Sequence, residues 1–411
     1  MELLPLVPRS WQERRWWPSL VRSAVLAVLI PTLVLGTWYR IQSYLVARER
    51  SLDPDPKGFY KLAREMGHPY ESGYREPLQI LLVKGSLALF GDRSSSVLIP
   101  TLVVSVLLIP VTFLFGRAVF SLPVGLGWAV LVGFNHHLIR SAARGYRMEL
   151  FAVLILLYVY VLLVARGWQP WRRWLLAGVV GGLLLLVRIT TVTVLVPALA
   201  LWVWRERKLG GQWGTSVAWA ALSLAVGLGM VAPYLVECQR VYGRPLYAID
   251  IHAQYWSDAE AGDNWAERMA TPIEEQSTMS VLDYLFSPGH VGRTVIRSIR
   301  GYWLAVRMLP WYAGSWRFVM SFALAGVAMT VVRRERYLLW VAFWTFLPFA
   351  VVMPIGGEVR FFLWLYPVYA LWVVVGLYPF GFGVLHHLRA AAGRRGSRPL
   401  EENRQALGPA L

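Results

Sequence analysis

The chain has 411 residues, of which 56% are hydrophobic and only 16% are charged, and the apolar residues come in long blocks. This composition excludes an ordinary soluble domain and predicts an all-α polytopic membrane protein. The net charge of +17 comes from short basic clusters between apolar blocks, which is typical of cytoplasmic loops, so we exclude nucleic-acid binding. The single cysteine, Cys238, excludes an intramolecular disulfide and a cysteine-based metal site.

The N-terminal part predicts a membrane anchor followed by an outer loop. Residues 1–22 are basic and aromatic, and we expect this segment at the cytoplasmic interface. The apolar run from Ser23 to Tyr39 has no small-x-small cleavage site after it, so it is interpreted as an uncleaved first span that delivers Arg40 to the outer face. In the outer loop 40–96, the run from Leu78 to Phe90 is too short to cross and predicts a helix along the outer surface.

The remaining apolar runs predict nine further spans, which makes ten with both termini in the cytoplasm. The run from Trp174 to Trp204 is too long for one upright span, so we expect two spans that meet on the outer side near Arg188. The other spans are predicted at Val97 to Phe115, Val124 to Ile139, Leu150 to Val164, Val217 to Leu235, Trp316 to Val332, Tyr337 to Met353 and Phe361 to Tyr378.

These spans define one transmembrane domain at 23–385 with two outer loops, 40–96 and 236–315. The second loop has mixed charge and segments that we interpret as interfacial helices. The tail at 386–411 is basic and contains Gly, Ser and Pro, so we expect a disordered cytoplasmic segment. This topology agrees with every basic cluster, and it predicts a multi-pass protein of the plasma (inner) membrane with its active site outside the cytoplasm.

The polar stretch from Leu52 to Pro77 is the first candidate for chemistry. Asp53 and Asp55 are each followed by proline, which fixes its own φ and pushes the preceding residue out of the helical region. We therefore expect two carboxylates held on a stiff backbone, followed by a short helix from Phe59 to Met66. The alternative is an ordinary solvated loop, because Asp-Pro is a common turn starter.

The sequence ARGYRMELF predicts a second polar site on the outer face. Arginines on that face oppose the usual bias, so Arg144 and Arg147 are interpreted as anion ligands. Glu149 begins a span, where capping of the helix dipole is the alternative to a functional role. Arg188 lies between apolar residues, and we favour a functional role over snorkelling to the surface.

Glu358 and Arg360 form a further outer turn, and mutual pairing is the alternative to a role in the site. Carboxylates and arginines that face one cavity suit transfer from a phosphate-activated donor. A carboxylate takes the proton of an acceptor hydroxyl, and arginines hold the phosphate leaving group. Because cytosolic nucleotide sugars are not available outside, a lipid-phosphate-linked donor is the natural candidate.

At these residues the chain resembles the GT-C membrane glycosyltransferases, in particular the branch that contains the lipid A aminoarabinose transferases and the protein O-mannosyltransferases. The resemblance rests on the order and spacing of five motifs between residues 20 and 380. They are Asp55 followed by FYKLAREM, REPLQILLVKGSLALFG, RGYRMELF, GLLLLVRITT and RFFLWLYP. The family's first acid is commonly followed by Glu, whereas Pro56 follows Asp55 here, and Asp53 offers a competing choice.

The resemblance implies an inverting transfer of a hexosyl or pentosyl group from a polyprenyl-phosphate carrier to an acceptor hydroxyl of a lipid, glycan or protein. By position it implies that Asp55, or Asp53, is the general base and that Glu149 supports the acceptor or a metal. The implied donor-phosphate residues are Arg147, Arg144, Arg188, Arg360 and Arg75. The implied acceptor or entrance residues are Glu76, Tyr60 and Glu358.

Two rival functions and one open cofactor question remain. A transporter or lipid flippase predicts repeat symmetry and polar residues through the membrane depth, and the sequence shows no repeat. A non-catalytic scaffold with the same fold is the second rival, since fold does not establish function. No metal ligands are assigned and no cofactor is certain, although a divalent cation is compatible with the implied chemistry. For His136 and His137 we favour interfacial packing over a metal role.

Overall fold

The computed structural model describes residues 17–163, 168–208, 210–261, 279–312, 317–332, 336–352, 354 and 363–378. Within these ranges every regular element is a helix and no strand occurs, which confirms the all-α class. Residues 1–16 and the tail 386–411 lie outside the described ranges, so what the sequence predicts for them stays a prediction.

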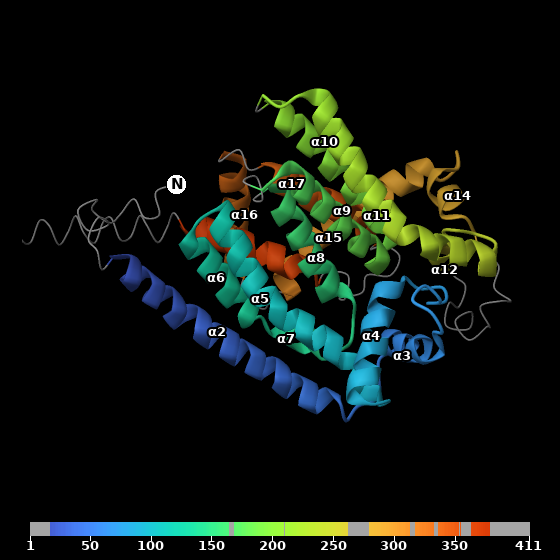
Figure 1. Ribbon diagram of the computed structural model, residues 1–411, viewed down its shortest axis with the longest axis horizontal. Helices are drawn as coiled ribbons and strands as arrows, with labels where there is room; N and C mark the ends of the chain where they lie inside the picture. The colour runs from blue at the N-terminus through green and yellow to red at the C-terminus, as the bar shows by residue number, and fades with distance from the viewer. Residues whose placement is uncertain are drawn as a thin grey trace, which may run out of the picture.

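The described part of the chain forms a series of helices (Figure 1). Up to the middle of the chain they are α2 (Trp17–Ala47), α3 (Pro54–Glu65), α4 (Pro77–Phe90), η1 (Ser94–Leu98), α5 (Ile99–Val119), α6 (Leu122–Gly133), α7 (His136–Ala142), α8 (Met148–Leu163) and α9 (Pro170–Val187). The later ones are η3 (Ile189–Thr191), α10 (Val192–Lys208), α11 (Trp213–Tyr242), α12 (Tyr247–Ala261), α14 (Val281–Phe286), α15 (Val291–Tyr312), α16 (Arg317–Val332), α17 (Arg336–Val352) and a last helix at Leu365–Tyr378.

Five helices of the described ranges are long and apolar enough to cross a membrane, or six if the bent pair α6 and α7 is one span. The five are Val21–Ala47, Ser94–Val119, Pro170–Val187, Ile189–Lys208 and Trp213–Tyr242. Shorter apolar helices occur at Pro77–Phe90, Met148–Leu162, Ser321–Val331, Tyr337–Val352 and Leu365–Tyr378. The chain is thus a membrane protein by its helices, and the count of ten spans stays a prediction.

The core of the bundle lies around α8, whose side chains are buried on nearly all sides by α5, α9 and the C-terminal helices. The sequence explains this position, because α8 carries aliphatic and aromatic residues all round its surface after Glu149. The last helix closes the bundle, where the Trp128 indole donates a hydrogen bond of 2.6 Å to the Pro367 carbonyl.

Small residues bring α9 and α11 into close contact. A Cβ on Gly178 would lie 2.7 Å from the Ser223 carbonyl oxygen, and one on Gly182 would lie 2.6 Å from the Met230 sulfur. Such approach is the usual role of glycine between membrane helices. The long apolar run from Trp174 to Trp204 divides where it was predicted to divide. Helices α9 and α10 are separate, and Arg188 lies at the break between them.

The first span differs from its prediction. Helix α2 continues to Ala47, beyond the predicted end at Tyr39, and Arg40 is completely buried among other helices. Figure 1 shows α2 along one edge of the molecule, with α3 and α4 beside its C-terminal end. The Arg40 guanidinium donates to Ser105 Oγ at 2.9 Å and to the carbonyls of Val132 at 3.0 Å and Gly133 at 2.7 Å.

These carbonyls explain a second difference, because the predicted span from Val124 to Ile139 is broken. Helices α6 and α7 meet at an angle of 58°. Asn135 begins α7 by accepting the Leu138 N–H at 3.0 Å, which is the usual N-cap geometry. The break leaves carbonyls at the end of α6 without helical partners, and Arg40 satisfies two of them.

The first outer stretch is more helical than predicted. Helix α3 already begins at Pro54, so only Asp53 is extended, with φ −58° and ψ 160°. Asp55 is helical although Pro56 follows it. A proline in the first helical turn removes only an N–H that has no partner there, so the helix tolerates both prolines.

Helix α11 runs to Tyr242, beyond Leu235, where the predicted span ends. Helix α12 then turns back towards the first outer stretch, and α15 packs along α17. The Tyr302 and Phe343 rings stack in that contact with centroids 4.8 Å apart. Residues 262–278 of this region lie outside the described ranges.

Candidate functional site

A small cavity of about 80 Å³ collects residues from several distant parts of the chain, and we call it the Asp55 cavity. Four of the predicted site residues line it, namely Asp55, Arg75, Arg147 and Arg188. Its other lining residues are Tyr146, Met148, His252, Trp256, Phe349 and Val352. The fold therefore brings the first acid and three predicted phosphate ligands together.

Asp55 is held by an ion pair. Both terminal nitrogens of Arg75 donate to Asp55 Oδ1 at 3.1 Å, and the Arg75 guanidinium also lies over the Phe59 ring at 5.0 Å. Burial disfavours the charge on Arg75, but the nearby Asp55 and Tyr74 outweigh burial and raise the Arg75 pKa. Helix α3 and the segment that precedes α4 thus fix one carboxylate and one cation at the cavity wall.

Glu76 joins three segments behind the cavity. Its side chain is 7% exposed, it forms an ion pair with Arg147, and its Oε1 accepts the Ile189 N–H at 3.1 Å. Arg147 also donates to the Val187 carbonyl at 2.9 Å. Burial alone would raise the Glu76 pKa, but Arg147 and Arg188 lower it below its ordinary value. The structure places Glu76 inside this contact and not at a solvent-exposed entrance.

Arg188 and His252 complete the polar lining. Arg188 donates to the Thr190 hydroxyl at 3.1 Å and lies over the Phe349 ring at 4.3 Å. His252 Nδ1 is 2.7 Å from the Ala248 carbonyl. Burial lowers the His252 pKa to about 4. The neighbouring Arg147, Arg75 and Arg188 also lower this pKa, whereas Glu76 raises it. The imidazole is neutral near pH 7, and because a carbonyl only accepts, its Nδ1 carries the proton.

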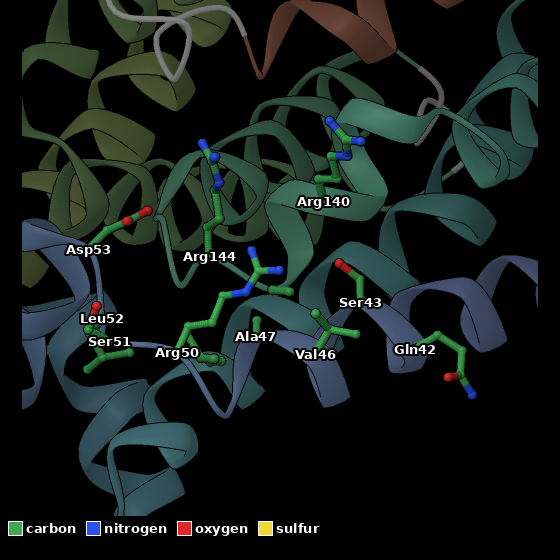
Figure 2. Close-up of a pocket in the computed structure, with 12 residues that line it drawn as sticks. Gln42, Ser43, Val46, Ala47, Arg50, Ser51, Leu52, Asp53, Arg140 and Arg144 are labelled. Atoms are coloured by element: carbon green, nitrogen blue, oxygen red, sulfur yellow. The ribbon is translucent and has the colours of Figure 1, made fainter.

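A second, larger cavity of about 660 Å³ lies beside the first, and we call it the Asp53 cavity (Figure 2). It is formed by the end of α2, the residues before α3, and α7 with the residues after it. Its lining residues are Gln42, Ser43, Val46, Ala47, Arg50, Ser51, Leu52, Asp53, Leu98, Arg140, Ala143 and Arg144. Arg144, predicted as a donor-phosphate ligand, therefore lines a different cavity from Arg147.

The wall between the two cavities is built from both polar motifs. The Tyr146 hydroxyl donates to Asp53 Oδ2 at 2.7 Å, while the Tyr146 ring faces the Asp55 cavity. Gly145 has φ +73°, and a Cβ there would lie 3.0 Å from Pro56 Cβ. Only glycine adopts this backbone without strain and leaves room for the proline. The two aspartates thus face different cavities although one residue separates them.

Three other predicted residues lie away from both cavities. Glu149 is 1% exposed inside the bundle, and its charge interacts with Arg40. The Tyr60 hydroxyl donates to Asp92 Oδ1 at 2.8 Å on the surface. The His137 ring stacks on Tyr366 with centroids 5.0 Å apart. Glu358 and Arg360 lie outside the described residues.

Sequence reasoning missed His252 and Trp256 of α12 and Phe349 of α17. The second outer loop was predicted, but nothing in its sequence indicated which of its helices faces the first acid. Tyr146 could have been found, because it lies inside the motif RGYRMELF that was already assigned to the outer face.

The described residues contain no group of three or more His, Cys, Asp or Glu side chains that could hold a metal ion. In the Asp55 cavity the carboxylate is paired with Arg75, and the other polar groups are two arginines, Tyr146 and His252. This donor set does not fit a divalent cation, which prefers several oxygen ligands. We therefore derive no step through a metal.

A comparison with protein families matches residues 68–236 to the family described as dolichyl-phosphate-mannose-protein mannosyltransferase. The match covers less than half of the chain, and it includes Arg75, Arg147 and Arg188 but not Asp53 or Asp55. A search of curated proteins finds no significant match.

Solved structures of an archaeal oligosaccharyltransferase share the fold. The chain is similar to AglB from Archaeoglobus fulgidus in complex with an inhibitory peptide and a dolichol-phosphate, with a TM-score of 0.58 and 16% identity over 92% of this chain and 52% of that one. It is similar to the apo form, with a TM-score of 0.55 and 17% identity over 95% and 53%. It is also similar to the complex with Zn and sulfate, with a TM-score of 0.54 and 17% identity over 87% and 50%.

The chain thus spans about half the length of the archaeal enzymes it matches. Together, the family match and the fold confirm the resemblance to the GT-C superfamily that the five motifs indicated. Neither comparison distinguishes a particular branch within the superfamily.

Proposed function

We propose that the chain is a membrane glycosyltransferase that moves a sugar from a polyprenyl-phosphate carrier to an acceptor hydroxyl. The observation that carries this proposal is the Asp55 cavity, where one carboxylate and three arginines from distant segments line the same small space. The family match and the shared fold support the reaction class.

The proposed transfer is a single displacement. The acceptor oxygen attacks the anomeric carbon while Asp55 takes its proton, and the bond from that carbon to the phosphate oxygen breaks with its electron pair staying on the phosphate. Arg147 and Arg188 stabilise the phosphate as its charge grows, because guanidinium groups bind phosphate oxygens with charge-assisted hydrogen bonds. Attack from the face opposite the phosphate inverts the configuration at the sugar.

The surrounding residues position these groups. Arg75 orients Asp55, Glu76 orients Arg147, and Phe349 and Trp256 provide apolar walls that exclude water. We assign His252 to a sugar hydroxyl, because it lies in the same cavity as the phosphate ligands.

The proposed setting is the plasma membrane. The basic segments 1–22 and 386–411 lie in the cytoplasm, ten spans occupy 23–385, and the two cavities open on the outer face. The positive clusters between the apolar runs support this orientation. The sugar, the acceptor class and any divalent cation are left open by this proposal.

The test begins with the donor. Mass spectrometry of lipid-linked sugars and glycans in cells that lack the protein should reveal an accumulated polyprenyl-phosphate sugar and a lost glycan modification. That donor is then given to the purified protein in liposomes. We expect Asp55→Asn to lower transfer by roughly 10²–10⁴-fold, the usual contribution of a general base, with unchanged elution on size exclusion.

The neighbouring acid is the matched control. Asp53→Asn should retain most of the transfer, because Asp53 faces the other cavity. Full activity in Asp55→Asn would remove its assigned role, and full activity in both variants would overturn the mechanism.

A further inference from the structure

The Asp53 cavity contains cations that the proposed displacement does not use. Arg50 follows α2, Arg140 belongs to α7, and Arg144 lies between α7 and α8. Figure 2 labels all three among the residues that line this cavity, with Arg144 between Asp53 and Arg140 and the Arg50 guanidinium between the Arg144 and Ser43 side chains. Two segments that are far apart in sequence, the end of α2 and the α7 region, thus contribute the three arginines.

These arginines differ from those of the Asp55 cavity in their charge balance. Across the described ranges, none of the three guanidiniums has a carboxylate within ion-pair distance, whereas Arg75 and Arg147 each have one. The only carboxylate in the lining is Asp53, and its Oδ2 already accepts from Tyr146. Three like charges around one hollow favour an anion, and the planar guanidinium matches phosphate geometry.

The position of the cavity indicates where the anion comes from. Gln42, Ser43 and Val46 extend α2 into the lining, and α2 is a candidate span of the membrane. One turn earlier the same helix exposes apolar side chains, with Trp38 55% and Ile41 37% exposed. Leu33, Val34, Leu35, Thr37, Trp38 and Ile41 line a shallow apolar hollow there. A charged cavity thus adjoins an apolar surface that is suited to a lipid chain.

We propose that the Asp53 cavity binds the phosphate-bearing headgroup of an amphiphilic acceptor, whose apolar part lies along α2. This inference rests on the proposed transfer, because it identifies the class of acceptor that reacts with the polyprenyl-phosphate donor. Arg50, Arg140 and Arg144 hold the anion, and the wall at Asp53 and Tyr146 separates it from the donor site. Because Tyr146 hydrogen-bonds to Asp53 and also lines the Asp55 cavity, the acceptor hydroxyl passes this side chain to reach Asp55 in the proposed complex.

Binding can be measured without knowing the natural acceptor. The full chain carries a photo-crosslinking residue, Ser43→p-benzoylphenylalanine, and is placed in phosphatidylcholine nanodiscs that contain phosphatidic acid as the phosphate-bearing probe. After irradiation, mass spectrometry counts the captured phosphatidic acid. We expect Arg50→Gln with Arg140→Gln and Arg144→Gln to lower capture by roughly tenfold or more, since each lost contact is charge-assisted.

Controls separate this site from general attraction to a basic protein. Arg172→Gln removes an exposed arginine beside another hollow and should leave capture unchanged. The triple Arg→Lys variant at 50, 140 and 144 keeps the charge and should retain part of the capture, which guards against misfolding of the glutamine variant. Capture that is equal in wild type and the triple glutamine variant overturns the inference.

A second arm tests the source of the phosphate. Soluble glucose 6-phosphate should displace phosphatidic acid only weakly, because it has no apolar part to lie along α2. Displacement at equal concentration would overturn the amphiphilic assignment. Asp55→Asn should leave capture intact, so a failure of the proposed transfer and a failure of this site give different results.

Discussion

The Asp53 cavity and the Asp55 cavity begin at the same run of residues, yet they arrange charge in opposite ways. In the Asp55 cavity Arg75 is paired with Asp55 and Arg147 with Glu76. In the Asp53 cavity, as far as the chain is described, Arg50, Arg140 and Arg144 have no carboxylate at ion-pair distance. A paired set holds a fixed geometry for chemistry, whereas an unpaired set is suited to capturing an anion.

The difference has a local origin in the backbone. Asp53 is the extended residue before α3, and Asp55 lies in the first helical turn. The side chains therefore leave the backbone in different directions, and Tyr146 and Gly145 close the space between them. Two acids that are close in sequence can thus belong to separate sites. Three substitutions test the contacts that hold the two cavities in this arrangement.

The largest effect is expected at the buried pair. Glu76→Gln leaves Arg147 as an uncompensated buried charge while keeping an acceptor for the Ile189 N–H. Loss of one partner of a buried pair destabilises by about 3–5 kcal/mol. Thermal unfolding in detergent, followed by tryptophan fluorescence, measures the change.

Two companions sharpen this result. Asp92→Asn breaks the exposed pair with Arg64 and should cost less than about 1 kcal/mol. Glu76→Gln combined with Arg147→Gln should recover part of the loss. A single Glu76→Gln variant as stable as wild type would show that this pair does not hold the paired cavity together.

A smaller effect is expected at the wall between the cavities. Gly145→Ala places a Cβ on a left-handed backbone and 3.0 Å from Pro56 Cβ, so we expect a loss of about 2 kcal/mol. Gly243→Ala is the matched control, because its φ of +71° is similar and no atom lies within 4 Å. It should cost only about 1 kcal/mol. Equal losses in the thermal unfolding of both variants would argue against close packing at the wall.

The third test is a pH dependence, whose effect at neutral pH is the smallest of the three because the stability does not change with pH there. Burial holds the His252 pKa at about 4, below its ordinary value of about 6.5. Between these values the unfolded chain binds more protons than the native protein, so stability falls as the pH is lowered through that window and is constant above it. Melting temperatures at several pH values should show this slope in wild type and less of it in His252→Gln. The exposed His68→Gln should keep the full slope.

Much of the helix arrangement can be predicted from the lengths of the apolar runs and from the residues that end them. The two helices that meet at Arg188 and the short helix α4 were predicted in this way. The bend between α6 and α7 was not, because its apolar run is continuous and Asn135 lies inside it. Burial of Arg40 escaped prediction because its partners at Ser105, Val132 and Gly133 are contributed by other helices.

The candidate site was predictable to the extent that the predicted topology places several charged residues on one face of the membrane. Asp55, Arg75, Arg147 and Arg188 were placed on that face and line one cavity. Asp53 and Arg144 line another cavity because of the direction in which their side chains point. The number of predicted spans determines only the membrane face on which a residue lies, and not this direction. The place of His252 in the cavity depends on where α12 packs. The sequence of this mixed-charge loop has no periodic pattern that predicts this packing.

The buried Arg40 also has a consequence for how the protein is made. Helix α2 is synthesised before α5 and α6, yet the Ser105 hydroxyl and the Val132 and Gly133 carbonyls that accept from its guanidinium belong to those later helices. An arginine inside a lone helix costs about 3 kcal/mol to place in lipid, so α2 gains its full stability only after two later helices have emerged. The buried position of Arg40 therefore depends on residues that are translated after α2.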